Sequence, residues 1–412
     1  MAGSPLSLFQ APVGAWFRAA LGEPTRAQAL GWPPIARGES TLLLAPTGSG
    51  KTLAAFLHAI DRLMREGAPP SKRRRTRVLY VSPLKALAAD VERNLRAPLA
   101  GTAEQARRAG AEPYVPTIDV RTGDTPQRDR ARMLRAPADI LITTPESLYL
   151  MLTSSARETL AAVDTVIVDE IHALVPSKRG AHLALSLERL EGVRAGSRPL
   201  QRIGLSATQR PLDEVARLLG GFEGGATRPV TVVDAGARKE LHLRVEAAVP
   251  EPDVEAQPGE PELIPSGDVL GRTDRSVWPS VHARVVELVR EHRTTIVFVN
   301  SRRLAERLAS AINEVAGEEI ALAHHGSLAR EKRTVIEDRL KRGDLRAIVA
   351  TSSLELGIDM GTVDLVVQIE APPSVASGMQ RIGRACHEVG GVPRGVLIPK
   401  HKQDLVACAA AS

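Results

Sequence analysis

Residues 45–52, with the sequence APTGSGKT, limit the possible folds of this chain more than any other stretch. The apolar run LLL precedes them at residues 42–44, and the helix-forming run LAAFL follows at residues 53–57. A buried strand, a glycine-rich turn and a helix start, in this order, build a loop whose backbone N–H groups surround phosphate oxygens. The stretch therefore predicts an α/β domain that binds a nucleotide.

The residues of this loop have separate expected roles. Glycines without a Cβ let the backbone approach the phosphates, Lys51 is placed for the β- and γ-phosphates, and the Thr52 hydroxyl is placed for Mg²⁺. Ala45 stands where the general pattern has glycine, but the GSGKT core is intact. Gln28, ahead of the loop, carries both a donor and an acceptor, as recognition of the adenine edge requires. The expected cofactors are ATP and Mg²⁺, and the loop residues that we expect to bind the nucleotide are Thr47, Gly48, Ser49, Gly50, Lys51 and Thr52.

Apolar runs alternate with helical or loop segments along the first half of the chain. Four such runs are residues 78–81, 140–143, 166–168 and 203–205. This alternation is typical of a doubly wound α/β domain with a mainly parallel sheet, whose ligands gather beyond the carboxyl ends of the strands. Polar residues follow all four runs, as SPLK, TPES, DEIH and SAT.

The acidic pair after the third run is the strongest catalytic candidate. Asp169 ends the run, where its carboxylate is placed to hold Mg²⁺, and Glu170 is suited to deprotonate the attacking water. An acidic pair at a strand end is also a common helix cap. The phosphate loop upstream favours the catalytic interpretation.

The second half of the chain repeats the α/β alternation without a second glycine-rich Lys-Thr loop. We expect a first domain at residues 1–225, a connecting strand and a linker rich in Pro, Gly and Glu at 226–278, and a second domain at 279–412. Arg381 and Arg384 are three residues apart and so share one face of a helix. Such guanidinium groups neutralise charge on a transferred phosphoryl group, so both are expected to be catalytic.

Composition excludes several classes of protein. The net charge of +6 permits a polyanionic partner, and aromatic residues make up only 3% of the chain. Contacts to a nucleic acid are therefore expected at its backbone rather than through stacked bases. No apolar run approaches the roughly 20 residues that span a bilayer, and no secretory signal is evident, so we expect no membrane partner and a cytoplasmic location. The two cysteines, Cys386 and Cys408, are too few to form a zinc site alone.

Taken together, these segments resemble the superfamily-2 helicases of the DEAD/DEAH type, and among them the large helicase-related (Lhr) family. The matching motifs are APTGSGKT, SPLKALAAD, TGDT, TTPESL, DEIH, SAT, IVFVNSRR, ATSSLELGIDMG and QRIGRA. The phrases TTPESLYLML and HHGSLAREKR are Lhr-like, as is the pair WF ahead of PTRAQALGW. The resemblance spans nearly the whole chain and implies two tandem RecA-like domains that close on ATP.

The resemblance also implies roles for single residues. His172, Ser206, Ala207 and Thr208 would couple hydrolysis to movement. Gln380 would be catalytic together with Arg381 and Arg384, and Gly357 and Asp359 would lie near the nucleotide and bind it. The residues implied to touch the nucleic-acid strand are Pro83, Lys85, Thr122, Gly123, Thr144 and Pro145 from the first domain, and Ser301, Arg302, Gly326, Thr351 and Glu355 from the second.

The implied activity is ATP-driven movement on single-stranded DNA in the 3′-to-5′ direction, with unwinding of a DNA duplex or an RNA–DNA hybrid. We expect the protein to act in DNA repair and as a monomer. An RNA helicase is one alternative. Another is a clamp that binds ATP and a strand with little turnover, because Cys386 replaces the family's glycine and the chain stops before the expected accessory domains. A Cβ at that position, if the position is a left-handed helix cap, is expected to lower the stability of the fold by on the order of 1 kcal/mol and to displace Arg384.

Overall fold

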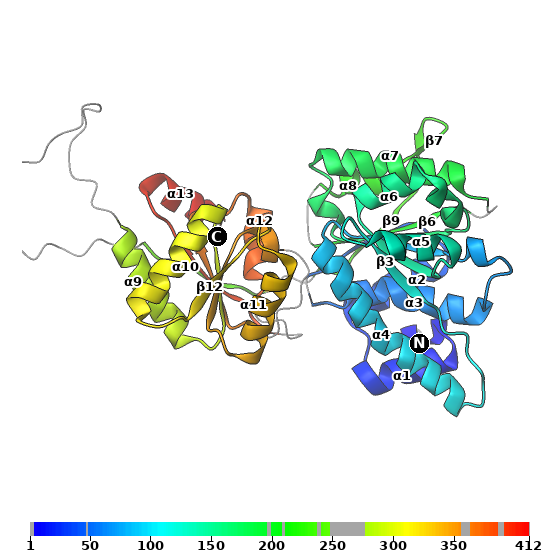
Figure 1. Ribbon diagram of the computed structural model, residues 1–412, viewed down its shortest axis with the longest axis horizontal. Coiled ribbons are helices and arrows are strands. Elements are labelled where there is room, and N and C mark those ends of the chain that lie inside the picture. Colours follow the sequence, from blue (N-terminus) through cyan, green and yellow to red (C-terminus); the bar gives the residue numbers. More distant parts are fainter. Residues whose placement is uncertain are drawn as a thin grey trace, which may run out of the picture. The chain divides into compact units, whose positions relative to one another are not determined.

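The computed structural model describes residues 4–46, 48–195, 199–207, 211–236, 240–247, 277–355, 363–385 and 391–411. These residues divide into two compact units, one up to Gly236 and the other from Glu240 onward. Each unit is a sheet with helices around it (Figure 1). The first unit also has a small two-stranded ribbon, β7 (Phe222–Glu223) and β8 (Ala226–Thr227).

The sheet of the first unit has seven strands in the order β3-β4-β2-β5-β6-β1-β9, and every neighbouring pair is parallel. Parallel strands of this kind are covered on both faces and read as apolar runs. The strands are β1 (Thr41–Leu44), β2 (Val78–Val81), β3 (Ile118–Arg121), β4 (Ile140–Thr143), β5 (Thr165–Val168), β6 (Gln201–Ser206) and β9 (Thr231–Asp234).

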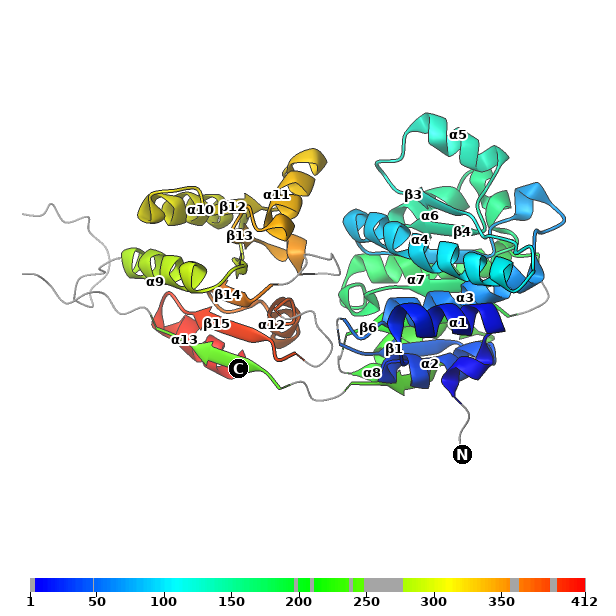
Figure 2. The same ribbon diagram turned by 90° about the horizontal axis from the view of Figure 1, so that it is seen from below.

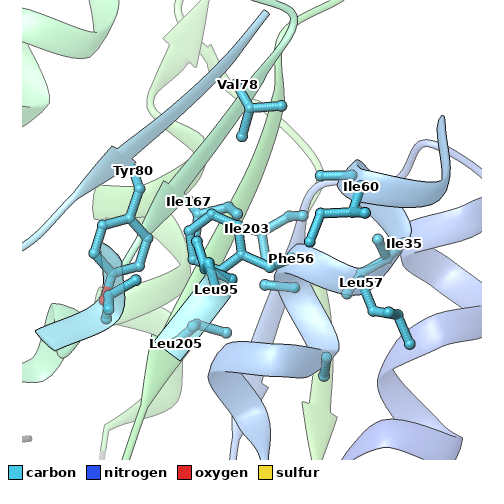
Figure 3. Packing of buried hydrophobic residues seen from close by; sticks show 14 of the residues in the cluster. Ile35, Phe56, Leu57, Ile60, Val78, Tyr80, Leu95, Ile167, Ile203 and Leu205 are labelled. Carbon is cyan, nitrogen blue, oxygen red and sulfur yellow. The ribbon is translucent and has the colours of Figure 1, made fainter. Parts of the chain in front are cut away.

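Two apolar clusters cover the two faces of this sheet, because successive strand residues point to opposite sides. Leu43 belongs to one cluster, whereas Leu42 and Leu44 belong to the other. The first cluster is filled by α1 (Ala11–Leu21), α2 (Arg26–Ala36), α3 (Lys51–Glu66) and α4 (Lys85–Arg108), and the second by α6 (Pro145–Leu152), α7 (Lys178–Val193) and α8 (Leu212–Gly220). Figure 3 shows side chains of the first cluster, where Phe56 of α3 packs on Tyr80 of β2 with the ring centroids 5.1 Å apart. The short α5 (Gln127–Arg135) follows β3.

The second unit has a six-stranded parallel sheet in the order β10-β15-β14-β11-β13-β12. Its strands are β10 (His242–Val245), β11 (Thr295–Phe298), β12 (Ala321–His324), β13 (Ala347–Ala350), β14 (Leu365–Ile369) and β15 (Arg394–Ile398). Its helices are α9 (Trp278–Glu291), α10 (Arg302–Ala316), α11 (Arg330–Arg342), α12 (Val375–Ile382) and α13 (Lys402–Ala411). Figure 2 shows α13 beside β10 and β15.

These two sheets confirm the expected fold of tandem doubly wound α/β domains, with one correction to the boundary. The passage expected to connect the domains contributes a strand to each sheet. β9 pairs with β1, and β10 pairs with β15. The first unit therefore extends to Gly236 instead of residue 225. In the described part of the chain, no helix is both long and apolar enough to cross a bilayer.

Candidate active site

The phosphate loop joins β1 to α3 in the first unit. Gly48 and Gly50 have φ angles of 79° and 75°, a backbone conformation that favours glycine. Gly50 is also the N-cap of α3, and a Cβ there would lie 2.5 Å from the Gln28 side-chain nitrogen. The Ser49 hydroxyl donates to the Pro46 carbonyl oxygen at 2.6 Å. Space and backbone conformation thus both require glycine at residue 50. Thr47 lies outside the described residues.

Gln28 lies directly against this loop and is buried. It forms a capping box with Thr25, whose backbone N–H donates to the Gln28 side-chain oxygen at 2.9 Å. The Gln28 amide also donates to the Gly50 carbonyl at 3.4 Å, and the Thr25 hydroxyl donates to the Ser49 carbonyl at 2.7 Å. The start of α2 therefore supports the loop. Recognition of adenine by Gln28 stays a prediction.

The acidic pair lies beside the lysine of the loop. Asp169, Glu170 and Lys51 are 2%, 5% and 6% exposed, and the Lys51 ammonium is 3.4 Å from a Glu170 carboxylate oxygen. Two buried carboxylates thus share one buried ammonium. Burial and, second, the charge of Glu170 raise the pKa of Asp169 to about 6. The Tyr80 hydroxyl and the Glu170 backbone N–H both donate to Asp169.

His172 connects the acidic turn to the end of β6. Its Nδ1 atom accepts a hydrogen bond from the Ala207 backbone N–H at 3.3 Å and lies 3.1 Å from the Ser206 hydroxyl oxygen. An accepting Nδ1 places the ring proton on Nε2, which is 3.4 Å from Glu170. Burial lowers the pKa of His172, with Glu170 opposing the effect and Lys51 adding to it. A neutral ring therefore links Glu170 to Ser206 and Ala207, and Thr208 lies outside the described residues.

The loops expected to touch a nucleic-acid strand come together at the carboxyl edge of the same sheet. Val81 pairs with both Thr143 and Val168, so the residues that follow these strands start side by side. The Lys85 ammonium donates to Asp124 at 2.5 Å, and its side chain is 52% exposed. Thr144 caps α6 and is buried. Pro83, Thr122 and Pro145 are buried on this edge as well, and Gly123 lies against Lys85.

In the second unit, Arg381 is 2% exposed and fully engaged within its own unit. It donates two hydrogen bonds to one Glu355 carboxylate oxygen, at 3.2 and 3.1 Å. It also donates to Asn300 at 3.0 Å and to Gln368 at 2.8 Å. The expected catalytic role of Arg381 stays a prediction, and these contacts show that it organises the carboxyl edge of β11 and β14.

Arg384 is buried to the same degree and donates to the Glu355 backbone carbonyl at 2.8 Å. Glu355, expected at the nucleic-acid strand, therefore holds both arginines. Gln380 lies on α12 and is partly exposed.

The remaining candidates for strand contact in the second unit lie in loops that follow its strands or at the start of α10. Ser301 caps α10, and Arg302 donates to Ser327 at 2.6 Å. Ser301, Arg302 and Gly326 are exposed, and Thr351 is partly exposed. The part of the chain that the structure describes does not include Gly357, Asp359 or Cys386.

Comparisons with known proteins agree with this geometry. Residues 25–215 match the family model of the DEAD/DEAH box helicases, and residues 281–387 match that of the helicase conserved C-terminal domain. The Lhr helicase/probable uracil glycosylase of Mycolicibacterium smegmatis is 52% identical over 438 residues, which cover 98% of this chain. The chain belongs to the Lhr family of DEAD/DEAH-type helicases. ATP-dependent helicase Lhr-Core protein 2 of Thermococcus barophilus is 42% identical over 401 residues, which cover 96% of the chain.

A solved structure extends the comparison to three dimensions. The Mycobacterium smegmatis helicase Lhr bound to ssDNA and AMP-PNP matches with a TM-score of 0.85 and 54% identity, over 99% of this chain and 50% of that one. This Lhr-type chain spans 27% of the length of the M. smegmatis relative and 44% of the T. barophilus relative.

Sequence reasoning missed several residues of this Lhr-type site. Tyr80 lies inside an apolar run, where nothing separates a phenol that serves Asp169 from an ordinary core residue. In the second unit, Asn300 follows an apolar run and Gln368 lies inside another, β14. Thr25 carried a usable signal, because Thr followed three residues later by Gln is the pattern of a capping box.

Proposed function

We propose that this chain is the motor of an Lhr-type helicase, which hydrolyses ATP and uses the energy to move on single-stranded DNA. The observation that carries the proposal is the buried group of Lys51, Asp169 and Glu170 beside the phosphate loop. The same sheet edge carries the loops that start at Ser82 and Thr144. Hydrolysis and strand contact can therefore influence each other within one unit.

Hydrolysis needs a base and positive charge near the phosphates, and the first unit offers a residue for each. Glu170 is a buried carboxylate and takes the proton of the attacking water. Lys51 leaves its ion pair with Glu170 for the γ-phosphate when ATP binds, which frees Glu170 to act. Because His172 contacts Glu170, Ser206 and Ala207, the loss of the Lys51–Glu170 ion pair then affects the position of Ser206 and Ala207.

The residues present fit a magnesium ion. Asp169 and Glu170 carry two negative charges against the single positive charge of Lys51, and this buried imbalance suits a divalent cation with oxygen ligands. Thr52 and Asp169 would hold the ion. Bound there, Mg²⁺ would neutralise the negative charge that develops on the phosphoryl group.

The choice of DNA rests on the similarity to the M. smegmatis helicase Lhr, whose structure was solved with ssDNA. Movement in the 3′-to-5′ direction, unwinding of RNA–DNA hybrids and a role in DNA repair rest on the family resemblance alone. An RNA helicase is the second candidate within the enzymes. Competition among matched DNA, RNA and hybrid duplexes separates the two.

The first test measures steady-state ATP hydrolysis with and without single-stranded DNA. We expect DNA to stimulate turnover, and the logarithm of its affinity to fall with the logarithm of salt concentration by about 0.7 per neutralised phosphate. An oligonucleotide with uncharged methylphosphonate linkages is the control and is expected to stimulate little. Tight binding of ATP and DNA without turnover supports the clamp, and salt-independent binding contradicts contact through phosphates.

A second prediction concerns Tyr80, whose hydroxyl donates to Asp169. Tyr80→Phe is expected to raise the Mg²⁺ concentration needed for half-maximal ATP hydrolysis about tenfold, because groups that orient a metal ligand contribute about 10- to 100-fold to affinity or activity. A magnesium titration measures the effect. Tyr114→Phe is the matched control, since Tyr114 donates to Asp139 at 2.7 Å at the opposite edge of the sheet. An equal magnesium requirement in both variants contradicts the proposed role of Tyr80.

A further inference from the structure

Arg179 lies in the first turn of α7, close behind the acidic turn that contains Glu170. The helix is capped by Ser177, and its start is packed tightly on the preceding backbone. A Cβ at Gly180 would lie 2.2 Å from the Leu174 carbonyl oxygen, so only glycine fits there. The position of Arg179 is therefore fixed relative to the acidic turn.

The guanidinium of Arg179 joins two separate loops. It donates to both carboxylate oxygens of Glu146, at 2.6 and 3.2 Å, and to the backbone carbonyl oxygen of Pro83 at 2.9 Å. Pro83 belongs to the loop that leads to Lys85, and Glu146 belongs to the helix that Thr144 caps. Both loops are candidates for contact with a nucleic-acid strand.

Stability alone gives little reason for this arrangement. The side chains of Arg179 and Glu146 are 45% and 55% exposed, and exposed ion pairs typically contribute about 0 to 1 kcal/mol. The two parallel hydrogen bonds instead fix the direction and spacing of Arg179 relative to Glu146. A planar guanidinium can form such a pair of bonds, and an ammonium group cannot. The hydrogen bond to a carbonyl of a different loop adds a third fixed point.

We propose that Arg179 is a positioning residue that holds the Pro83 and Thr144 loops at the spacing needed to grip consecutive phosphates of one strand. The inference rests on the proposed function. Because Arg179 is attached to the helix that follows the acidic turn, it also ties the spacing of these loops to that turn. Its positive charge is neutralised by Glu146 and is not the source of affinity.

A direct phosphate contact by Arg179 is the competing explanation. The two explanations predict opposite effects of Glu146→Ala on DNA binding. If Arg179 bound phosphate itself, Glu146→Ala would free the guanidinium, remove a repulsive charge and tighten DNA binding. If Arg179 holds the loops, Glu146→Ala loosens them and weakens binding. Arg179→Lys separates the explanations again, since lysine keeps the charge but cannot form the fork.

The test measures the dissociation constant for a fluorescent single-stranded oligonucleotide at fixed salt, together with ATP turnover without DNA and the melting temperature. We expect Arg179→Lys and Glu146→Ala each to raise the dissociation constant about tenfold, or about 1.4 kcal/mol. Turnover without DNA and the melting temperature should stay as in the wild type. Matched controls are Arg217→Lys and Glu214→Ala, because that pair is 2.7 Å apart and similarly exposed, and both residues lie on one helix, α8.

Two results would overturn the inference. One is unchanged or tighter DNA binding by Glu146→Ala, and the other is binding by Arg179→Lys that equals that of Arg217→Lys. Failure of the proposed function looks different, since the wild-type chain itself would then neither bind single-stranded DNA nor be stimulated by it.

Discussion

Glu170→Gln is expected to lower ATP turnover by about 10² to 10⁴, the usual contribution of a general base. The amide has the shape of the carboxylate but cannot take a proton from water. Glu170 is buried, and Lys51 lies within 3.4 Å, so the substitution removes a charge without opening a cavity. Steady-state hydrolysis with saturating single-stranded DNA measures the loss.

Nucleotide binding distinguishes this effect from damage to the site. We expect the Glu170→Gln variant to bind a non-hydrolysable ATP analogue at least as well as the wild type, because a buried negative charge near the phosphates has gone. Glu158→Gln, an exposed site in the same unit, serves as the control and should hydrolyse ATP normally. Turnover within a few-fold of the wild type would remove Glu170 from the proposed chemistry.

Arg384→Lys is expected to lower DNA-stimulated turnover by about 10³, at the lower end of what an arginine finger contributes. Lysine keeps the charge but loses the planar fork that suits phosphoryl oxygens. Arg384 donates to the Glu355 backbone carbonyl, whereas Arg381 donates to three side chains of its own unit, so Arg381 has a clear structural role as well.

The same substitution at Arg381 provides the contrast. Arg381→Lys leaves Glu355 and Gln368 without the guanidinium that donates to both, so it should lower the melting temperature as well as activity. Arg384→Lys should lower activity with a smaller loss of melting temperature, because lysine can still donate a hydrogen bond to the Glu355 backbone carbonyl. Equal losses of stability in both variants, or full activity in Arg384→Lys, would contradict this division of roles.

Local sequence was enough to predict the core of the fold and the phosphate loop. The runs at 78–81 and 140–143 coincide with β2 and β4, because a parallel strand buried on both faces must be apolar throughout. β3 was missed because it is an edge strand with half-buried residues, so its sequence IDVR lacks such a run. Nothing in the sequence predicted that β9 joins the first sheet and β10 the second.

The sequence by itself determined the two α/β domains, the glycine-rich loop and the acidic pair, because each depends on neighbours in the chain. Only the tertiary structure decided which distant side chains meet. Tyr80 reaches Asp169 across adjacent strands, Arg381 turns inward to Glu355, and Arg179 joins two loops. These contacts depend on strand order and on the common edge where parallel strands end, and the spacing of residues along a chain does not specify either.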